Sequence, residues 1–402
     1  TQRLLILPRP PSADNPSRDP RLRLALISTE LGVGGADRCV TQLALGLQQR
    51  GHEVVVYSLA PPPEAPRDGF VRSLEAAAVP VQFLGVKRKR QAAAALRQLT
   101  ELLRQQQPHV VQSFLFHANI LGTSAARRAG LKRIVAGLRV VDRRWLRVSL
   151  ERWSSRWWQR AVSVSQSVDA FAETALRLPA ARRLVIPNGI DLSRFTSSEN
   201  ATSGTTPVDW TAWGIPTAAP TLVAIGRLHP QKGFDWLIEQ MPSIVHDLPN
   251  HHLLIVGEGP ARASLEAQIK RLGLAARVHL AGWQANVPAI LQSAAGLLLP
   301  SRWEGLPNVV LEAMAAGRPV LAAQVEGVTE LLGELSAPQT FPWGNASEFR
   351  TKLLAWAESS AAATALATSL GSANHPRAVK TFSLAAMIDR SERLYQELVL
   401  EA

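Results

Sequence analysis

The sequence predicts an α/β protein with two doubly wound domains, each built on a parallel sheet with helices on both faces. Three observations support this fold class. Apolar runs of strand length alternate with amphipathic helical stretches, a pattern typical of parallel sheets. The alternation stops at residues 196–217, where Thr, Ser, Asn, Gly and Pro are frequent, and then starts again. The length of 402 residues suits two domains of ordinary size.

The first alternating series occupies residues 21–195, after a Pro-rich stretch at 1–20 that we interpret as a flexible tail. Its first strand is predicted at 22–28 and is followed by a glycine-rich loop and a helix that ends at Gly51. The further strands predicted in this series lie at 53–59, 79–84, 109–115, 133–137, 161–165 and 183–186.

The second series occupies residues 218–376, and the stretch at 196–217 is predicted to link it to the first. Residues 377–402 are predicted to contain a final helix with Ser383 as its N-cap. The apolar side of this helix consists of Leu384, Met387, Ile388, Leu394 and Leu398. The strands predicted in the second series lie at 221–225, 252–256, 278–281, 296–300 and 319–323.

The composition narrows the compartment and the partners. The chain has no apolar run of the roughly 18–20 residues that a membrane span needs, and its apolar piece at 4–7 is too short for a secretory signal. A single cysteine, Cys39, leaves no internal disulfide, so we expect a cytoplasmic protein. The net charge of +12 suits either a nucleic-acid binder or a protein that meets anionic membranes and phosphorylated substrates.

The loops that follow strands are where function is expected, because open parallel sheets bind ligands beyond the carboxyl ends of their strands. The loop after the strand at 221–225 contains Gly226, Arg227 and, after a short turn, Lys232. Arginine forks onto phosphate oxygens and lysine adds a compact charge. The two cations could therefore stabilise a diphosphate as its bond to a sugar breaks, or they could be solvated surface charges.

A second loop carries Gly257 and Gly259 after the strand at 252–256. Because glycine has no side chain, its backbone can approach a ligand closely. The same two residues could instead form only a tight turn before a helix.

The most informative loop follows the strand at 296–300 and begins a predicted helix. Pro307 suits the first turn of that helix, whose unpaired amides would form an anion or hydroxyl site. One glutamate precedes these amides and a second lies about 7 Å further along the axis, at about 1.5 Å per residue. Both could bind sugar hydroxyls, or they could be a dipole-balancing residue and an exposed residue. The residues predicted to bind here are Glu304, Gly305, Leu306, Asn308 and Glu312.

Two features of the first domain are further candidates. The loop with Gly34 and Gly35 could form a nest of amides for a phosphate or an acceptor, or it could be a steric turn. His117 follows the strand at 109–115 and could donate a hydrogen bond to a transferring sugar, although a single histidine can also be structural. No Asp-x-Asp pair occurs in the sequence, so we expect no metal ion and no cofactor.

An Arg- and Trp-rich stretch lies at residues 139–160, and 87–90 forms a second basic cluster. Arg152, Arg156 and Arg160 recur every four residues, with Trp153 and Trp157 beside them. A helix of this composition suits the interface of an anionic bilayer. A core-facing Trp stripe with a solvated Arg face is the competing interpretation. Neither cluster accompanies a nucleic-acid recognition motif, so no nucleic-acid partner is expected.

Together these motifs resemble those of the group 1 (family 4) retaining glycosyltransferases. The resemblance spans residues 22–398. Its departures are Gln112 and Ser113, where relatives often carry a histidine, and Asp37, where relatives often carry glutamate. The segments that carry it are 226–228 with 231–233, 257–260, 300–305, 312–320, 34–38, 116–119, 164–165 and 186–191.

The resemblance implies a GT-B fold, in which two Rossmann-like domains face an interdomain cleft and the last helix crosses back to the first domain. It implies that Arg227 and Lys232 hold the donor diphosphate, that Glu312 binds the ribose and that Glu304 with its neighbouring amides engages the donor sugar. His117 would contact the sugar near the reacting carbon. The implied reaction retains the anomeric configuration, and the leaving phosphate helps to deprotonate the acceptor, so that no protein nucleophile is needed.

The expected donor is a nucleotide diphosphate sugar, with a UDP-sugar as the first candidate and GDP-mannose as the second. The enzyme would move a hexose or N-acetylhexosamine to a glycan or lipid-linked acceptor in surface polysaccharide or glycolipid synthesis. Contact with the inner face of the cell membrane is a further expectation. The alternatives are a nucleotide-sugar epimerase-like enzyme, a non-catalytic sugar-nucleotide-binding protein and a nucleic-acid binder, the last suggested by the net charge alone.

Overall fold

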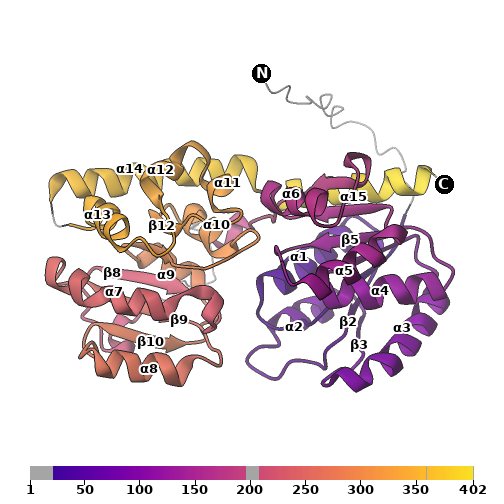
Figure 1. Cartoon of the computed structure of the whole chain (residues 1–402), viewed down its shortest axis with the longest axis horizontal. Helices are drawn as coiled ribbons and strands as arrows, with labels where there is room; N and C mark the ends of the chain where they lie inside the picture. The colour runs from indigo at the N-terminus through magenta and orange to yellow at the C-terminus, as the bar shows by residue number, and fades with distance from the viewer. Residues whose placement is uncertain (1–20, 196–207, 359, 402) are drawn as a thin grey trace.

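The computed structural model describes residues 21–195, 208–358 and 360–401, which form two parallel sheets with helices packed on them (Figure 1). The predicted fold class of two doubly wound domains is confirmed. The predicted tail at 1–20 and the first part of the predicted linker, 196–207, lie outside the described residues.

The first sheet has seven strands in the order β3-β2-β1-β4-β5-β6-β7. Its neighbouring strands are all parallel, so helical crossovers join them. The strands are β1 (Arg23–Ser28), β2 (Glu53–Ser58), β3 (Val81–Phe83), β4 (Val110–Phe114), β5 (Ile134–Leu138), β6 (Arg160–Ser163) and β7 (Arg183–Val185). The helices are α1 (Gly35–Gln49), α2 (Gly69–Ala76), α3 (Ala92–Gln106), α4 (Phe116–Arg128), α5 (Trp145–Ser154) and α6 (Gln166–Thr174).

The second sheet has six parallel strands in the order β10-β9-β8-β11-β12-β13. The strands are β8 (Thr221–Ile225), β9 (His252–Val256), β10 (Val278–Gly282), β11 (Gly296–Leu299), β12 (Val320–Ala323) and β13 (Thr340–Phe341). The helices are α7 (Phe234–Asp247), α8 (Arg262–Arg271), α9 (Val287–Ser293), α10 (Asn308–Ala315), α11 (Val328–Leu332), α12 (Ser336–Gln339), α13 (Ala346–Ala357), α14 (Ala361–Thr381) and α15 (Leu384–Leu400). Short 3-10 turns are η1 (Lys89–Gln91), η2 (Ser155–Trp157), η3 (Ala180–Arg182), η4 (Leu192–Arg194), η5 (Trp210–Trp213), η6 (Pro230–Lys232) and η7 (Gly333–Leu335).

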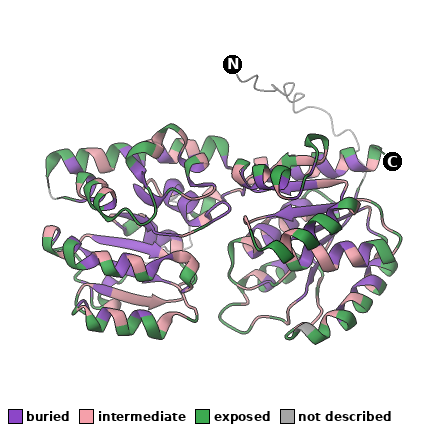
Figure 2. Cartoon of the chain, in the orientation of Figure 1, coloured by how far each residue is buried: buried purple, intermediate pink, exposed green. Residues whose placement is uncertain are grey.

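The central strands are buried on both faces, as parallel sheets between helices require (Figure 2). Strands β4, β9, β11 and β12 are buried along their whole length. The observed strands agree with the predicted ones, with ends that differ by no more than two residues. Strand β13 was not predicted, because the two residues Thr340 and Phe341 are too few to make a pattern.

The described end of the predicted linker, 208–217, is packed against the rest of the protein. Turn η5 places Trp210 in the core, and Ile215 is 1% exposed. The side chain of Asp209 begins this turn by accepting a hydrogen bond from the amide of Thr211. The sequence pattern did not predict this packing, because most residues of the segment at 196–217 are polar or turn-forming and it depends on the two large apolar residues Trp210 and Ile215.

The C-terminal helices connect the two halves (Figure 1). Helix α14 continues past residue 377, where the final segment was placed, and the chain crosses over at Phe382 and Ser383. The Ser383 hydroxyl accepts a hydrogen bond from the amide of Ala386, so the predicted N-cap is confirmed. Helix α15 then packs against α1 so closely that an added Cβ at Gly46 would lie 2.1 Å from Ile388 Cδ1. The apolar side predicted for this helix is therefore used to cover the first domain.

Candidate active site

The loop after β8 places a lysine against a buried glutamate. Lys232 Nζ lies 2.5 Å from Glu304 Oε1, and the Ser301 hydroxyl donates to the same oxygen over 2.6 Å. The Glu304 side chain is only 8% exposed. The aliphatic part of Lys232 lies over Gly226, where an added Cβ would meet Lys232 Cε at 3.2 Å. The sequence-predicted residues Gly226, Lys232 and Glu304 are thus brought together.

Glycine at position 233 is what permits this arrangement. Its φ is +67°, and an added Cβ would lie 2.0 Å from the carbonyl oxygen of Pro300. Any side chain would therefore separate the loop after β8 from the loop after β11. The positions of Lys232 and Glu304 depend on the close approach of these two loops.

Arg227 is exposed and makes no hydrogen bond or ion pair with any residue in the described ranges. Its neighbour Leu228 is buried and holds the loop in place. A guanidinium in this setting is available to an anionic ligand at the carboxyl end of β8.

The second glycine loop supports the first loop. Gly257 has a φ of +141°, and an added Cβ there would lie 1.9 Å from the carbonyl oxygen of Gly226. An added Cβ at Gly259 would lie 2.3 Å from the carbonyl oxygen of Leu228. Their glycine character therefore has a steric cause within the protein, which favours the tight-turn interpretation. Contact of Gly257 or Gly259 with a ligand remains a prediction.

Helix α10 begins at Asn308, and Pro307, which was predicted in its first turn, is the N-cap residue just before it. Glu312 is 3% exposed, so the alternative in which it is an exposed residue is wrong. Its carboxylate forms an ion pair with the Arg38 guanidinium of α1, in the other domain. Burial lowers the pKa of Arg38 to about 10, and the positive charge of Arg194 adds to the effect.

Asn308 joins the two domains. Its amide nitrogen donates to the carbonyl oxygen of Gly35 over 3.2 Å, and its oxygen accepts from Asn188 over 2.6 Å. Arg139 in turn donates to the Asn188 side chain over 2.6 Å. Gly305 packs on the same region, since an added Cβ would lie 1.8 Å from the carbonyl oxygen of Arg139. The segment at 304–308 therefore touches the first domain directly. Leu306, also in that segment, is buried and belongs to the core that spans both domains.

The predicted amide nest of the first domain is already occupied. The amides of Gly32 and Gly34 donate to Asp37 Oδ2 over 3.1 and 3.0 Å. Burial and, to a smaller extent, the charge of Glu30 raise the pKa of Asp37 to about 7, although the hydrogen bonds from the two glycine amides act to lower it. An anion could use the Gly34 amide only if the Asp37 carboxylate moved away. Gly35 makes its described contact through its carbonyl, to Asn308.

His117 is exposed in the first turn of α4, on the first domain. Its ring contacts Phe116 edge to face at 5.2 Å. Beneath this turn the Asn119 side chain accepts a hydrogen bond from the Ser113 hydroxyl and donates one to the Glu151 carboxylate. Burial raises the pKa of Glu151 to about 7. These contacts orient the start of α4.

The positions that depart from the family pattern have structural partners. Gln112 accepts a hydrogen bond from the Tyr395 hydroxyl of α15, and Ser113 donates to Asn119. Gln112 therefore anchors the returning helix, and Ser113 anchors α4. Asp37 closes the glycine loop, as described above.

The Arg- and Trp-rich stretch does not form one helix. Helix α5 ends at Ser154, and Arg160 begins strand β6, where it pairs with Glu401. The prediction that Arg152, Arg156 and Arg160 share one helical face is therefore wrong. A turn separates them because Trp158 is 2% exposed and donates to Thr123 in the core.

The outward side of α5 is apolar nonetheless. Trp145 is 77% exposed, Leu146 is 55%, Leu150 is 39% and Trp153 is 46%. A wholly core-facing Trp stripe is therefore wrong for Trp145 and Trp153.

None of the helices in 21–195, 208–358 and 360–401 has both the length and the hydropathy of a membrane span. Within the same ranges, His, Cys, Asp and Glu side chains do not gather in threes at a place that could hold a metal ion.

Sequence reasoning assigned no role to Arg38, Asn188 or Arg139, although they contribute to the contact between the domains. The signal that could have found them is position, because Arg139 and Asn188 lie in the loops after β5 and β7, and Arg38 lies near the start of the helix that follows β1.

Two family descriptions, one for each half of the protein, together match most of the chain. Residues 219–359 match the family described as glycosyl transferases group 1, and residues 33–194 match glycosyltransferase family 4.

Relatives and solved structures agree with this. The chain is 26% identical over 244 residues to the UDP-Gal:alpha-D-GlcNAc-diphosphoundecaprenol alpha-1,3-galactosyltransferase of Escherichia coli, a match that covers 58% of this chain and 62% of that protein. It is 31% identical to the lipopolysaccharide core biosynthesis glycosyltransferase LpsE of Rhizobium meliloti, over 49% of this chain and 55% of that protein. The chain thus spans less than two thirds of the length of these two relatives. The structure of Anabaena HepE in complex with UDP and glucose has the same fold, with a TM-score of 0.78 and 20% identity over 93% of this chain and 100% of that chain.

Proposed function

Because the chain belongs to the group 1, family 4 glycosyltransferases, we propose that it moves a hexose or N-acetylhexosamine from a nucleotide diphosphate sugar to a hydroxyl of a glycan or lipid-linked acceptor. The observation that carries the proposal is the cluster at the carboxyl ends of β8 and β11. There Lys232 is held by buried Glu304, and Arg227 stands beside them with no partner among the described residues.

The two cations suit a diphosphate leaving group. In the proposed reaction the bond between the sugar C1 and the phosphate oxygen breaks, and a bond between C1 and the acceptor oxygen forms on the same face. The acceptor proton passes to the leaving phosphate, so the anomeric configuration is retained and no protein nucleophile takes part. Arg227 and Lys232 stabilise the charge that grows on the phosphate, in positions set before the reaction begins.

The remaining candidates have positions consistent with donor binding. Glu304 and the backbone amides of Gly305, Leu306 and Asn308 would engage the sugar, and Glu312 would accept hydrogen bonds from the ribose hydroxyls. Because Glu312 is paired with Arg38 across the domains, a bound ribose would share this carboxylate with Arg38 or displace it. His117 would reach the sugar from the first domain.

The donor proposed first is a UDP-sugar, with GDP-mannose second. Support comes from a fold neighbour solved with UDP and glucose and from a relative named for UDP-Gal. The same relative is named for a diphosphoundecaprenol-linked acceptor, which favours a lipid-linked acceptor and a role in polysaccharide or glycolipid synthesis.

The experiment that tests the function is a hydrolysis and transfer screen against a panel of UDP-, GDP-, ADP- and dTDP-sugars, in excess EDTA. We expect one nucleotide sugar to be cleaved to its nucleoside diphosphate, with unchanged rate in EDTA, because Arg227 and Lys232 provide the positive charge. Chromatography of the nucleotides measures it. Strict dependence on added Mg²⁺ or Mn²⁺ would refute a metal-independent clamp, and cleavage of none of the panel would refute the transferase itself.

We also propose peripheral contact with an anionic membrane through the outward side of α5. The side carries Trp145, Leu146, Leu150 and Trp153. Arg152 of the same helix and Arg156 of the following turn η2 are also exposed, and this composition is suited to a lipid interface. In this proposal the enzyme works at the inner face of the cell membrane.

Replacing Arg152 and Arg156 by Ser should weaken binding to vesicles of phosphatidylglycerol and phosphatidylcholine about 5- to 30-fold, since each basic residue near an anionic surface contributes about 1 kcal/mol. Vesicle sedimentation measures it. The matched control is Arg97→Ser with Arg393→Ser, which removes the same charge from exposed positions on α3 and α15. Equal weakening in both double variants would show a response to net charge rather than to this face.

A further inference from the structure

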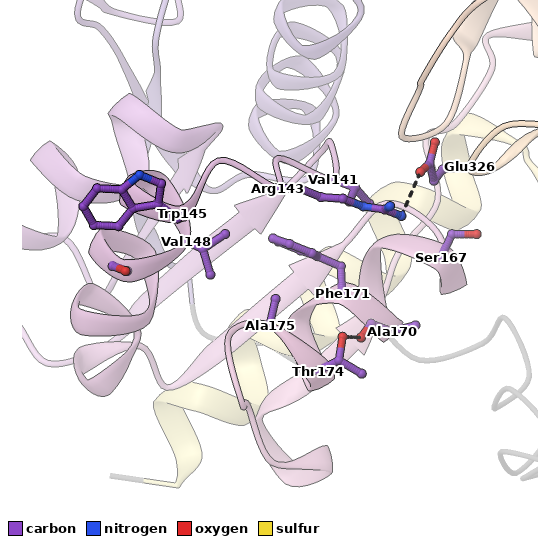
Figure 3. Close-up of a pocket in the computed structure, with 11 residues that line it drawn as sticks. Val141, Arg143, Trp145, Val148, Ser167, Ala170, Phe171, Thr174, Ala175 and Glu326 are labelled. Atoms are coloured by element: carbon purple, nitrogen blue, oxygen red, sulfur yellow. Dashed lines mark hydrogen bonds and ion pairs between the residues drawn. The ribbon is translucent and has the colours of Figure 1, made fainter.

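A groove of about 750 Å³ runs between α5 and α6 on the first domain (Figure 3). Val141 and Val148 line one side, Phe171 and Ala175 line the other, and Glu326 of the second domain closes one end. Its volume is that of a small-molecule site rather than of a packing defect. None of the residues proposed to bind the donor lines it.

The lining is apolar along the groove and charged at one end. Figure 3 shows Val148, Phe171 and Ala175 directed toward one another, with Arg143 and Glu326 together at the end near the second domain. Trp145, which is 77% exposed, continues the apolar lining onto the outward side of α5. A ligand with an apolar chain and an anionic group at one end would match the apolar walls and the Arg143 guanidinium.

The charged end lies next to the proposed donor site. Val141 lies two residues after Arg139, whose carbonyl oxygen faces Gly305. Glu326 precedes Gly327, where an added Cβ would lie 2.3 Å from the carbonyl oxygen of Gly305. Both walls of this end are thus continuous with the backbone that surrounds Gly305. With consecutive Cα atoms about 3.8 Å apart, Val141 is within about 8 Å of Arg139.

Among the arginines near this end of the groove, Arg143 has the weakest ion pair with the rest of the protein. Arg144 and Arg147 both bond Asp142, and the only ion pair of Arg143 in the described residues is a 3.9 Å contact with Glu326. Its side chain is 83% exposed. If Arg143 turns to a phosphate, Glu326 loses this long contact, and its side chain, which is 23% exposed, can still meet water.

We infer that this groove binds the hydrocarbon chain of an isoprenoid-phosphate acceptor, with Arg143 on its phosphate. The inference rests on the proposed transferase function and specifies its acceptor. The chain lies between α5 and α6, its distal end leaves past Trp145 toward the membrane, and the sugar on its phosphate end is presented near Gly305. The acceptor hydroxyl would then meet the donor sugar where the two domains touch.

The test uses the full chain with farnesyl phosphate as the probe, below the concentration at which it aggregates, and isothermal titration calorimetry as the readout. Ala170→Trp fills the groove from the exposed face of α6, and Ala94→Trp is the matched control on an exposed position of α3. We expect Ala170→Trp to weaken binding at least 10-fold and Ala94→Trp to leave it unchanged. Hydrolysis of the nucleotide sugar without acceptor should stay as in the unmodified protein in both variants.

A second pair of variants separates the phosphate from the chain. Arg143→Glu should weaken farnesyl phosphate binding about 10-fold and leave farnesol binding unchanged, with Arg97→Glu as the control. Equal binding of farnesyl phosphate to Ala170→Trp and the unmodified protein would overturn the groove, as would an effect of Ala170→Trp on vesicle binding alone. If nucleotide sugars are not cleaved by the unmodified protein, the proposed function fails, and this is visible independently of farnesyl phosphate binding.

Discussion

Replacing Arg227 by Ala is expected to reduce sugar transfer about 10²- to 10³-fold while leaving the thermal stability of the protein unchanged. The size follows from the loss of one positioned charge that stabilises the leaving diphosphate. Stability should not change, because Arg227 is exposed and bonds to no other described residue. The measurements are kcat with the donor found in the screen and the apparent unfolding temperature by differential scanning fluorimetry.

Two further variants test whether the loss of activity comes from the charge and the shape of the Arg227 side chain. Arg227→Lys should recover part of the rate, since it keeps the charge and loses the fork that binds two phosphate oxygens. Arg271→Ala is the matched control, because it removes an exposed arginine of the same domain from α8, where its ion pair is with the exposed Glu239. An Arg227→Ala variant with full activity would remove Arg227 from the proposed clamp.

Replacing Lys232 by Met is expected to reduce transfer at least 10³-fold and also to destabilise the protein. The catalytic loss has the same cause as for Arg227. The destabilisation arises because Glu304, whose side chain is 8% exposed, would be left as a buried carboxylate without its cation. Breaking a buried ion pair from one side costs about 3–5 kcal/mol. Lys232→Met should therefore lower the stability of the protein and Arg227→Ala should not, although both variants lose activity.

The double variant Lys232→Met with Glu304→Gln separates the two effects. Glutamine carries no charge and its amide oxygen can still accept the Ser301 hydroxyl. We expect the unfolding temperature to return toward that of the unmodified protein while transfer stays lost. Because a two-domain chain need not unfold in one step, the comparison is between apparent midpoints under one set of conditions. Restored transfer in the double variant would contradict a role for Lys232 in binding the diphosphate.

The groove and the outward side of α5 are proposed to bind the acceptor and the membrane, and neither is proposed to bind the donor. Variants at Ala170 and Arg143 should change what is glycosylated and leave donor cleavage intact, whereas Arg227 and Lys232 variants should lose both. Kinetics with and without acceptor can therefore assign each residue to one half of the reaction.

Local patterns in the chain were enough to predict the two doubly wound sheets, nearly all of their strands and the N-cap at Ser383. A buried parallel strand is a short apolar run between turn residues, and that signal lies within a few neighbouring positions. The same reasoning selected the loops with Lys232 and Glu304, because ligands bind where parallel strands end. Strand β13 was not predicted, because two residues are too few to form a pattern. The prediction that Arg160 shares a helical face with Arg152 and Arg156 was wrong, because the chain turns to bury Trp158 between them.

The contacts across the two halves could come only from the folded chain. Arg38 with Glu312 and Gly35 with Asn308 join positions separated by 274 and 273 residues. The occupation of the Gly34 amide by Asp37 and the groove between α5 and α6 likewise depend on how side chains fill space. Periodicity reports which face of an element is apolar, whereas the partner of a polar group is set by the packing of whole domains, to which every buried contact contributes.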